Sequence, residues 1–303
     1  MRSFGSVFFL CLAGGSLFGQ SPTAKPPQPV TRSQPDPLVE ARRNPAKLVE
    51  KKFDDLTDKN LSEHGRAAIA LADKWRHGET DHFVIHFLKL TDAQRLAREA
   101  EFYYLKIKLD LGADADRSRG KSHLYLFDKD KLWTQFRPRL GLQDWAAGVA
   151  VGRELFFAAE PGAVQANSNK MAHELTHVVF YRFASRRVPL WLNEGFAEFQ
   201  SEAAYAKFKG VGHRAAGTTQ PHQFPLADLT RLTDYPNNEL AVRAFYEESE
   251  RLVRFLISRH DNKLFVLFVN ELSVGASFDE AVLKIYSAKY KAFPEFERAY
   301  QRF

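Results

Sequence analysis

The stretch MAHELTHVVF, from Met171 to Phe180, constrains this chain more than any other part of its sequence. Its apolar residues recur at helical spacing on most sides, which predicts a helix that is largely buried. His173, Glu174 and His177 nevertheless stand where a core helix would carry Leu or Ala. Burying polar groups without partners is costly, so the fold has to provide partners for these three side chains.

Helix geometry indicates a metal ion as the partner. Residues i and i+4 of an α-helix differ by about 40° in direction and stand one turn apart, so His173 and His177 can meet a single ion. Their spacing therefore predicts a pair of ligands for a divalent metal. Glu174 points about 100° away from His173, beside the ion's open position. A carboxylate there can take a proton from a metal-activated water and pass it on.

The next predicted helix, VPLWLNEGFAEF, offers a third ligand. Pro189 is typical of a helix start. Glu194 and Glu198 share a face at i and i+4, so Glu194 can complete the metal site while Glu198 orients a ligating imidazole. Gly195 costs helix stability, which indicates that two backbones approach closely there. The alternative interpretation is that the two glutamates form a solvated helix face, although large apolar residues surround them.

These two motifs resemble those of the gluzincin zinc metallopeptidases. HELTH is followed, after sixteen residues, by the Glu of NEGFAE, and VPLWLNEGFAEF is particularly similar to the compact bacterial branch called peptidase MA-like. The resemblance implies a zinc-dependent metallopeptidase that hydrolyses peptide bonds by a metal-activated water. His173, His177 and Glu194 would bind Zn²⁺, with Glu174 as general base and Glu198 holding a ligand in place. The GAMEN motif of aminopeptidases is absent, so an endopeptidase is expected.

The resemblance also implies roles in substrate binding. In such enzymes an edge strand above the zinc helix holds the substrate backbone. ELFFAAEP could fill that role, through Leu155, Phe156, Phe157 and Ala158. A Tyr or His from the helical part commonly stabilises the oxyanion, for which Tyr246 is the candidate, with His222 or His213 behind it. A tyrosine on an amphipathic helix is also a common core residue, and that reading of Tyr246 stays open.

The N-terminal residues predict export. Residues 1–20 carry one Arg, a short apolar run and small residues, which is typical of a secretory signal peptide. A retained anchor is the alternative, but the run is shorter than the roughly 18 residues that span a bilayer. Cys11 is the only cysteine, so the mature chain would lack disulfides and thiol chemistry. We expect a periplasmic or extracellular bacterial protein without stable membrane insertion.

The remaining sequence predicts an α+β fold, in which a small mixed sheet and the active-site helix precede a helical lobe, and the resemblance implies that this fold is zincin-like. Residues 21–37 are a Pro-rich disordered linker and 38–78 an N-terminal helical segment, with helices over 38–53 and 61–77. Residues 79–303 form the catalytic domain, divided into a sheet lobe (79–160), the zinc helices (168–208) and a helical lobe (225–303). Strands are predicted at 82–87, 122–127, 146–151 and 154–159.

The formal charge of +6 is spread thinly, and no aromatic-interleaved basic patch accompanies it, so we expect no nucleic-acid partner. The expected partner is a peptide or protein substrate, bound by a monomer. Two alternatives remain. One is a non-enzymatic envelope protein that binds peptide and retains the gluzincin fold and its metal site. The other is a hydrolase of an unusual amide, such as a cell-wall peptide.

Overall fold

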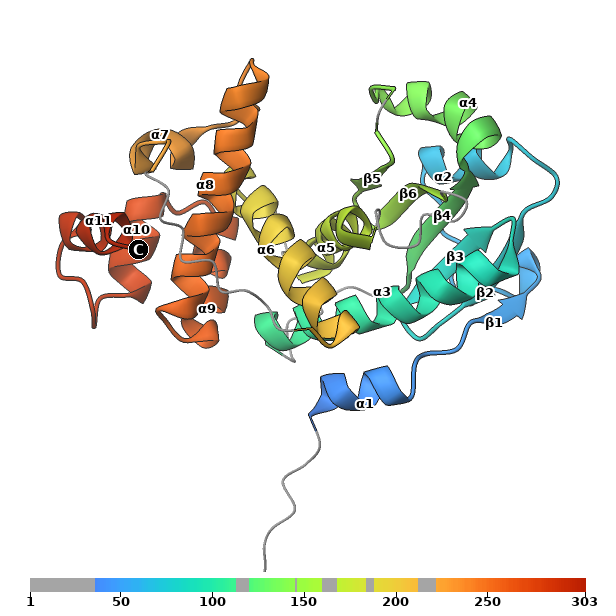
Figure 1. The fold of residues 1–303 in the computed structure, drawn as a ribbon, viewed down its shortest axis with the longest axis horizontal. Coiled ribbons are helices and arrows are strands. Elements are labelled where there is room, and N and C mark those ends of the chain that lie inside the picture. Colours follow the sequence, from blue (N-terminus) through green and yellow to red (C-terminus); the bar gives the residue numbers. More distant parts are fainter. Residues whose placement is uncertain (1–35, 113–119, 145, 160–167, 184–187, 212–221) are drawn as a thin grey trace, which may run out of the picture. The chain divides into compact units, whose positions relative to one another are not determined.

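The computed structural model describes residues 36–112, 120–144, 146–159, 168–183, 188–211 and 222–303, and residues 36–303 belong to one compact unit. Its sheet has six strands in the order β1-β2-β3-β4-β6-β5. β3, β4 and β6 are parallel neighbours, and the remaining pairs are antiparallel. The strands are β1 (Val49–Lys51), β2 (Arg76–Glu79), β3 (Phe83–Phe87), β4 (Ser122–Asp128), β5 (Gly148–Val151) and β6 (Glu154–Ala159). The predicted α+β class with a mixed sheet is confirmed (Figure 1).

Helices make up most of the remaining described structure. They are α1 (Pro37–Arg43), η1 (Phe53–Asp55), α2 (Glu63–Ile69), α3 (Leu90–Leu111), η2 (Lys129–Trp133), α4 (Thr134–Phe136), η3 (Arg137–Leu140), α5 (Ser168–Phe183), α6 (Leu190–Lys209), α7 (Leu226–Arg231), α8 (Glu239–Ser258), α9 (Asn262–Ser273), α10 (Phe278–Ile285) and α11 (Phe293–Gln301). Among the residues that the structure describes, no helix combines the length and apolar character needed to cross a membrane.

The two faces of the sheet have separate cores because side chains alternate along each strand. Ile85, Leu124 and Leu155 point to the face covered by α3 and α5, where they join the larger hydrophobic cluster. Tyr125 and Phe156 point to the opposite face, into a smaller cluster with residues from α2, η2 and α4. The helix that carries the HELTH motif therefore lies on the sheet's larger core.

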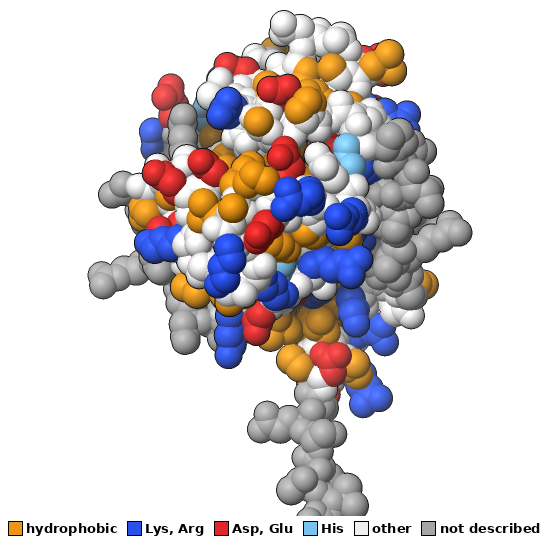
Figure 2. Space-filling model, turned by 90° about the vertical axis from the view of Figure 1, so that its left-hand side faces the viewer, with side chains coloured by type: hydrophobic (Ala, Val, Ile, Leu, Met, Phe, Trp, Pro, Cys, Tyr) orange, Lys and Arg blue, Asp and Glu red, His pale blue; other side chains and the backbone are white. Residues whose placement is uncertain are grey.

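Buried apolar side chains are spread around helix α6, as expected for a helix enclosed by other helices. Trp191, Leu192 and Phe196 are fully buried, and α6 lies between α5 and α8 (Figure 1). α7 also contacts α6 and α8, and α9 to α11 follow on α8. Figure 2 shows the face of the molecule on the α7 and α11 side, where Lys and Arg side chains are interspersed with acidic and hydrophobic ones.

The N-terminal part differs from the prediction. The helix predicted over 38–53 ends at Arg43, and the one predicted over 61–77 ends at Ile69. β1 and β2 follow them and extend the sheet beside β3. Periodicity missed both strands because β1 has three residues and β2, RHGE, contains no apolar side chain. The predicted signal peptide, and the linker apart from its last two residues, lie outside the described residues.

A row of buried aromatic side chains crosses the second face of the sheet. His77, His86, Tyr125 and Phe156 are register partners on β2, β3, β4 and β6. Nδ1 of His86 lies 2.8 Å from Nδ1 of His77, and its Nε2 lies 3.0 Å from Nδ1 of His123. The sequence alone provided no partner for His86 or His123, because both contacts are made across strands.

This row predicts a loss of stability in acid. Burial lowers the pKa of His77 and of His123, although Asp58 and Glu154 oppose the effect on His123. Burial and the neighbouring imidazoles lower the pKa of His86 well below its ordinary value. As the pH falls below about 6.5, the unfolded chain binds protons that the folded chain does not, so the free energy of unfolding decreases.

The variant His86→Phe isolates one such group. In urea denaturation below pH ~6.5, its free energy of unfolding should fall less steeply with pH than that of the wild type, by up to about 1.4 kcal/mol per pH unit. Tyr125→Phe is the control, because burial and Glu154 raise the pKa of Tyr125 far above this range. Equal slopes for His86→Phe and the wild type would contradict the assignment.

Candidate metal centre

Helix α5 has one face in the core and one face toward a pocket. Ala172, Leu175, Val178 and Val179 are fully buried against the sheet and neighbouring helices. The imidazoles of His173 and His177 lie on the other side, 14% and 15% exposed. The helix is thus less enclosed than its composition suggests, because its polar stripe meets solvent through the pocket.

Helix α6 approaches α8 so closely that only glycine fits at position 195. A β-carbon on Gly195 would lie 2.3 Å from the carbonyl oxygen of Ser249 and 2.5 Å from its carbonyl carbon. The predicted close approach of two backbones is confirmed. This contact holds the N-terminal part of α6, which carries Glu194, between α8 and the histidine-bearing face of α5.

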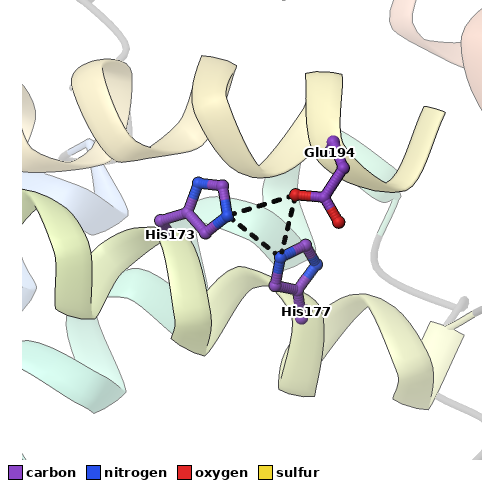
Figure 3. A group of neighbouring side chains, drawn as sticks. All are labelled: His173, His177 and Glu194. Carbon is purple, nitrogen blue, oxygen red and sulfur yellow. Dashed lines mark hydrogen bonds and ion pairs between the residues drawn. The ribbon is translucent and has the colours of Figure 1, made fainter. Parts of the chain in front are cut away.

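Three side chains from these two helices converge. Nε2 of His173 and Nε2 of His177 lie 3.1 Å apart, and Oε2 of Glu194 lies 3.4 Å and 3.6 Å from them (Figure 3). Tetrahedral coordination with bonds of roughly 2.0–2.1 Å separates ligand atoms by about 3.3 Å. The donor set and its spacing therefore fit a divalent ion, and among the described residues this is the one His, Cys, Asp and Glu group with such geometry.

Glu198 contacts the first of these imidazoles. Its Oε1 lies 3.1 Å from Nδ1 of His173, on the ring side opposite the cluster. A proton on Nδ1 leaves the Nε2 lone pair facing the cluster, which is the tautomer a metal requires. The structure thus places Glu198 where the sequence predicted it.

The carboxylates stabilise positive charge at this point. Burial acts to lower the pKa of His173, but the contacts with Glu194 and Glu198 outweigh it and raise that pKa to about 10. Burial acts to raise the pKa of Glu194, and the two imidazoles outweigh it, so this pKa is well below its ordinary value. A cluster that favours both an imidazolium and an ionised carboxylate also favours a cation between them.

Glu174 faces the edge of the sheet, beside the cluster. Its Oε2 accepts a hydrogen bond of 3.1 Å from the backbone N–H of Ala150 on β5. Burial raises the pKa of Glu174, the charges of His177 and His173 oppose this, and the carboxylate of Glu194 adds to it. A carboxylate with a raised pKa is suited to accepting and returning a proton.

A pocket of about 610 Å³ opens over these residues. β5 forms one wall, and Phe180 with Leu190 provides an apolar region. Tyr246 lines the pocket, and its ring centre lies 6.3 Å from that of His173. Tyr235, from the connection between α7 and α8, lines it as well.

The predicted edge strand is wrong. β6 is not an edge strand, because β4 and β5 pair with its two sides. Its predicted substrate contacts are buried in the sheet and do not reach the pocket: Leu155, Phe156, Phe157 and Ala158. The hairpin at Gly152 turns the chain back, so the earlier strand, β5, becomes the edge above α5. His222 also lies away from the described pocket lining, because buried Glu248 binds its Nδ1, and His213 is outside the described residues.

Sequence reasoning missed Tyr235. Its hydroxyl donates a hydrogen bond of 2.9 Å to Oε1 of Glu194, the oxygen that turns away from the imidazoles. Tyr235 follows Glu194 by 41 residues and lies in the loop sequence TDYPN. A single tyrosine in a polar loop carries no periodic or motif signal, so only the folded chain reveals this contact.

The fold and the site together define a protein of the zincin-like class, with a mixed sheet, a histidine-bearing helix beneath its edge strand and a glutamate on the following helix. The family model of the Peptidase MA superfamily matches residues 120–300, well over half of the chain, so the chain belongs to that superfamily. Membership indicates a metallopeptidase-type function. A comparison with curated proteins found no match.

The approach of α6 to α8 predicts a large effect of Gly195→Ala. The added methyl group would collide with backbone atoms of Ser249, which cannot move aside without separating the helices. We expect the free energy of unfolding, measured by denaturant titration, to fall by about 1–3 kcal/mol or more. Lys207→Ala, at an exposed position of the same helix, should change it by less than about 0.5 kcal/mol. A Gly195→Ala protein as stable as the wild type would contradict the contact.

Proposed function

We propose that this chain is a zinc-dependent metallopeptidase of the gluzincin type, with the HExxH motif on α5, and that it acts as an endopeptidase. The proposal depends on one observation: the ligand atoms of His173, His177 and Glu194 lie close enough together to bind a single metal ion. Glu174 lies beside them. Two imidazoles and one carboxylate are a common donor set for catalytic zinc, which keeps its fourth position for water. Membership in the Peptidase MA superfamily supports the same conclusion.

Each residue of the site would have its own role in peptide hydrolysis. When bound, a zinc ion supplies a Lewis acid that lowers the pKa of a coordinated water and polarises the scissile carbonyl. Glu174 takes a proton from the attacking water and delivers it to the leaving amine nitrogen as the C–N bond breaks. Glu198 would hold the proton of the neutral His173 ring on Nδ1, so that Nε2 carries the lone pair that binds the ion. Tyr246 lines the pocket, and its hydroxyl would donate a hydrogen bond to the oxyanion.

The outer edge of β5 would hold the substrate backbone. β5 pairs only with β6 among the described strands, and the N–H of Ala150 points to the free side, toward Glu174. An extended peptide can add to such an edge by main-chain hydrogen bonds, largely independent of its side chains. The edge strand predicted from the resemblance is thus replaced by its neighbour, and the scissile bond would lie between β5 and the three ligands.

Glu174→Gln tests the general base. The amide cannot accept the water proton, so hydrolysis of casein or of a peptide library should fall by at least about 10²-fold. Zinc content should stay at the wild-type level, because Glu174 is not one of the three converging ligands. Glu271→Gln, which alters a carboxylate on α9 paired with Lys284, serves as the matched control and should retain activity. Full activity of Glu174→Gln would refute the assigned base.

Metal removal tests the cofactor. A chelator should abolish peptidase activity, and Zn²⁺ should restore it with close to one ion per chain. If zinc binds only the folded protein, free zinc at a thousand times the dissociation constant should raise the free energy of unfolding by about 4 kcal/mol. Activity that survives complete metal removal would exclude the zinc mechanism. Peptide binding without cleavage by the zinc-loaded chain would instead indicate the non-enzymatic peptide-binding protein.

A further inference from the structure

Glu194 is held at both of its carboxylate oxygens, by different parts of the chain. Oε2 faces the two imidazoles, at 3.4 Å from His173 and 3.6 Å from His177. Oε1 accepts the hydroxyl of Tyr235 at 2.9 Å and faces the side-chain amide of Asn193 at 3.4 Å. Glu194 is buried, with 4% of its surface exposed, so bulk water cannot replace these donors freely.

Tyr235 reaches this carboxylate from outside the two ligand-bearing helices. It lies between α7 and α8, and its residue surface is 48% exposed at the rim of the pocket. Its ring packs edge-on against Phe245 at 6.0 Å between ring centres and lies 6.1 Å from the ring of Tyr246. These contacts with α8 orient the ring, so the hydroxyl is directed at Glu194 by packing as well as by the hydrogen bond.

We propose that Tyr235 is a positioning residue that keeps Glu194 a one-oxygen ligand. This inference rests on the proposed function. By occupying Oε1, the hydroxyl of Tyr235 leaves Oε2 alone to face the ion. A carboxylate that turned to bind through both oxygens would occupy a coordination position that a catalytic site needs for water. The α7–α8 connection thereby controls how open the site is, although it contributes no ligand.

The separation in sequence makes this role specific to the tertiary structure. Asn193 adjoins Glu194 and makes the longer contact, so it cannot replace the hydroxyl of Tyr235 at equal strength. Tyr246 is the comparison for Tyr235, because it is also a tyrosine and lines the same pocket. The two tyrosines differ in that Tyr235 donates directly to Glu194.

Tyr235→Phe removes the hydroxyl and keeps the ring that packs on α8. We expect kcat for peptide hydrolysis to fall about 10–100-fold, as for loss of a partner that orients a metal ligand, with KM changed less than threefold. In the substrate-free protein loaded with Co²⁺ in place of zinc, the visible absorption bands should change, because they depend on ligand number and geometry. The hydroxyl of Tyr246 hydrogen-bonds that of Tyr235 and has no direct bond to Glu194, so Tyr246→Phe should change the substrate-free Co²⁺ spectrum less than Tyr235→Phe, whatever it does to kcat.

The outcomes separate this inference from the proposed function. An unchanged Co²⁺ spectrum with kcat unaltered in Tyr235→Phe would overturn the positioning role while leaving the peptidase in place. A rise in KM alone would also overturn it, because that result assigns Tyr235 to substrate binding. A zinc-loaded wild type that cleaves no peptide would refute the proposed function, and a spectral change in Tyr235→Phe would still support the carboxylate contact. Circular dichroism melting curves of the two variants exclude unfolding as the cause.

Discussion

The enclosure of α6 between α5 and α8 is the constraint on which the rest of the site depends. Because Gly195 already places its backbone against the carbonyl of Ser249 on α8, the first turns of α6 cannot move away from α5 without colliding with α8. The adjacent Glu194 is therefore held at a distance set by backbone packing rather than by a flexible side chain. Ligand geometry that is fixed before an ion arrives costs little reorganisation when the ion binds.

Electrostatic compensation explains why so many ionisable groups lie together. Glu174, Glu194 and Glu198 surround two imidazoles in a partly buried pocket. Each charge would be unfavourable alone, but the carboxylates stabilise positive charge at the cluster and the imidazoles hold Glu194 ionised. The pKa of Glu174 is raised in the same surroundings, because Glu174 is buried like Glu194 but the two imidazoles stabilise its negative charge less. One arrangement thus separates a carboxylate suited to binding a cation from one suited to moving protons.

The buried histidines of the sheet form a contrasting group. His77 and His123 each contact His86, and the Asp58 carboxylate approaches His123 only to 3.8 Å, so burial lowers the pKa of all three imidazoles, whereas the pKa of His173 is raised. The two ring nitrogens of His86 contact two different histidines. The three imidazoles therefore do not direct their nitrogen atoms at one point, as the ligands of a metal ion would. The chain therefore contains two clusters rich in histidine, one arranged to remain neutral and one arranged around positive charge.

The sequence by itself determined the local geometry of the site. Positions i and i+4 on one helix oblige His173 and His177 to share a face, and the same holds for Glu194 and Glu198 on the next helix. The long helices α3 and α8 were also predictable, because they carry sustained helical periodicity. Only the tertiary structure decided that β5 rather than β6 is the edge, that β1 and β2 join the sheet, and that Tyr235 reaches Glu194. These features depend on pairing and packing between distant segments, which side-chain periodicity does not encode.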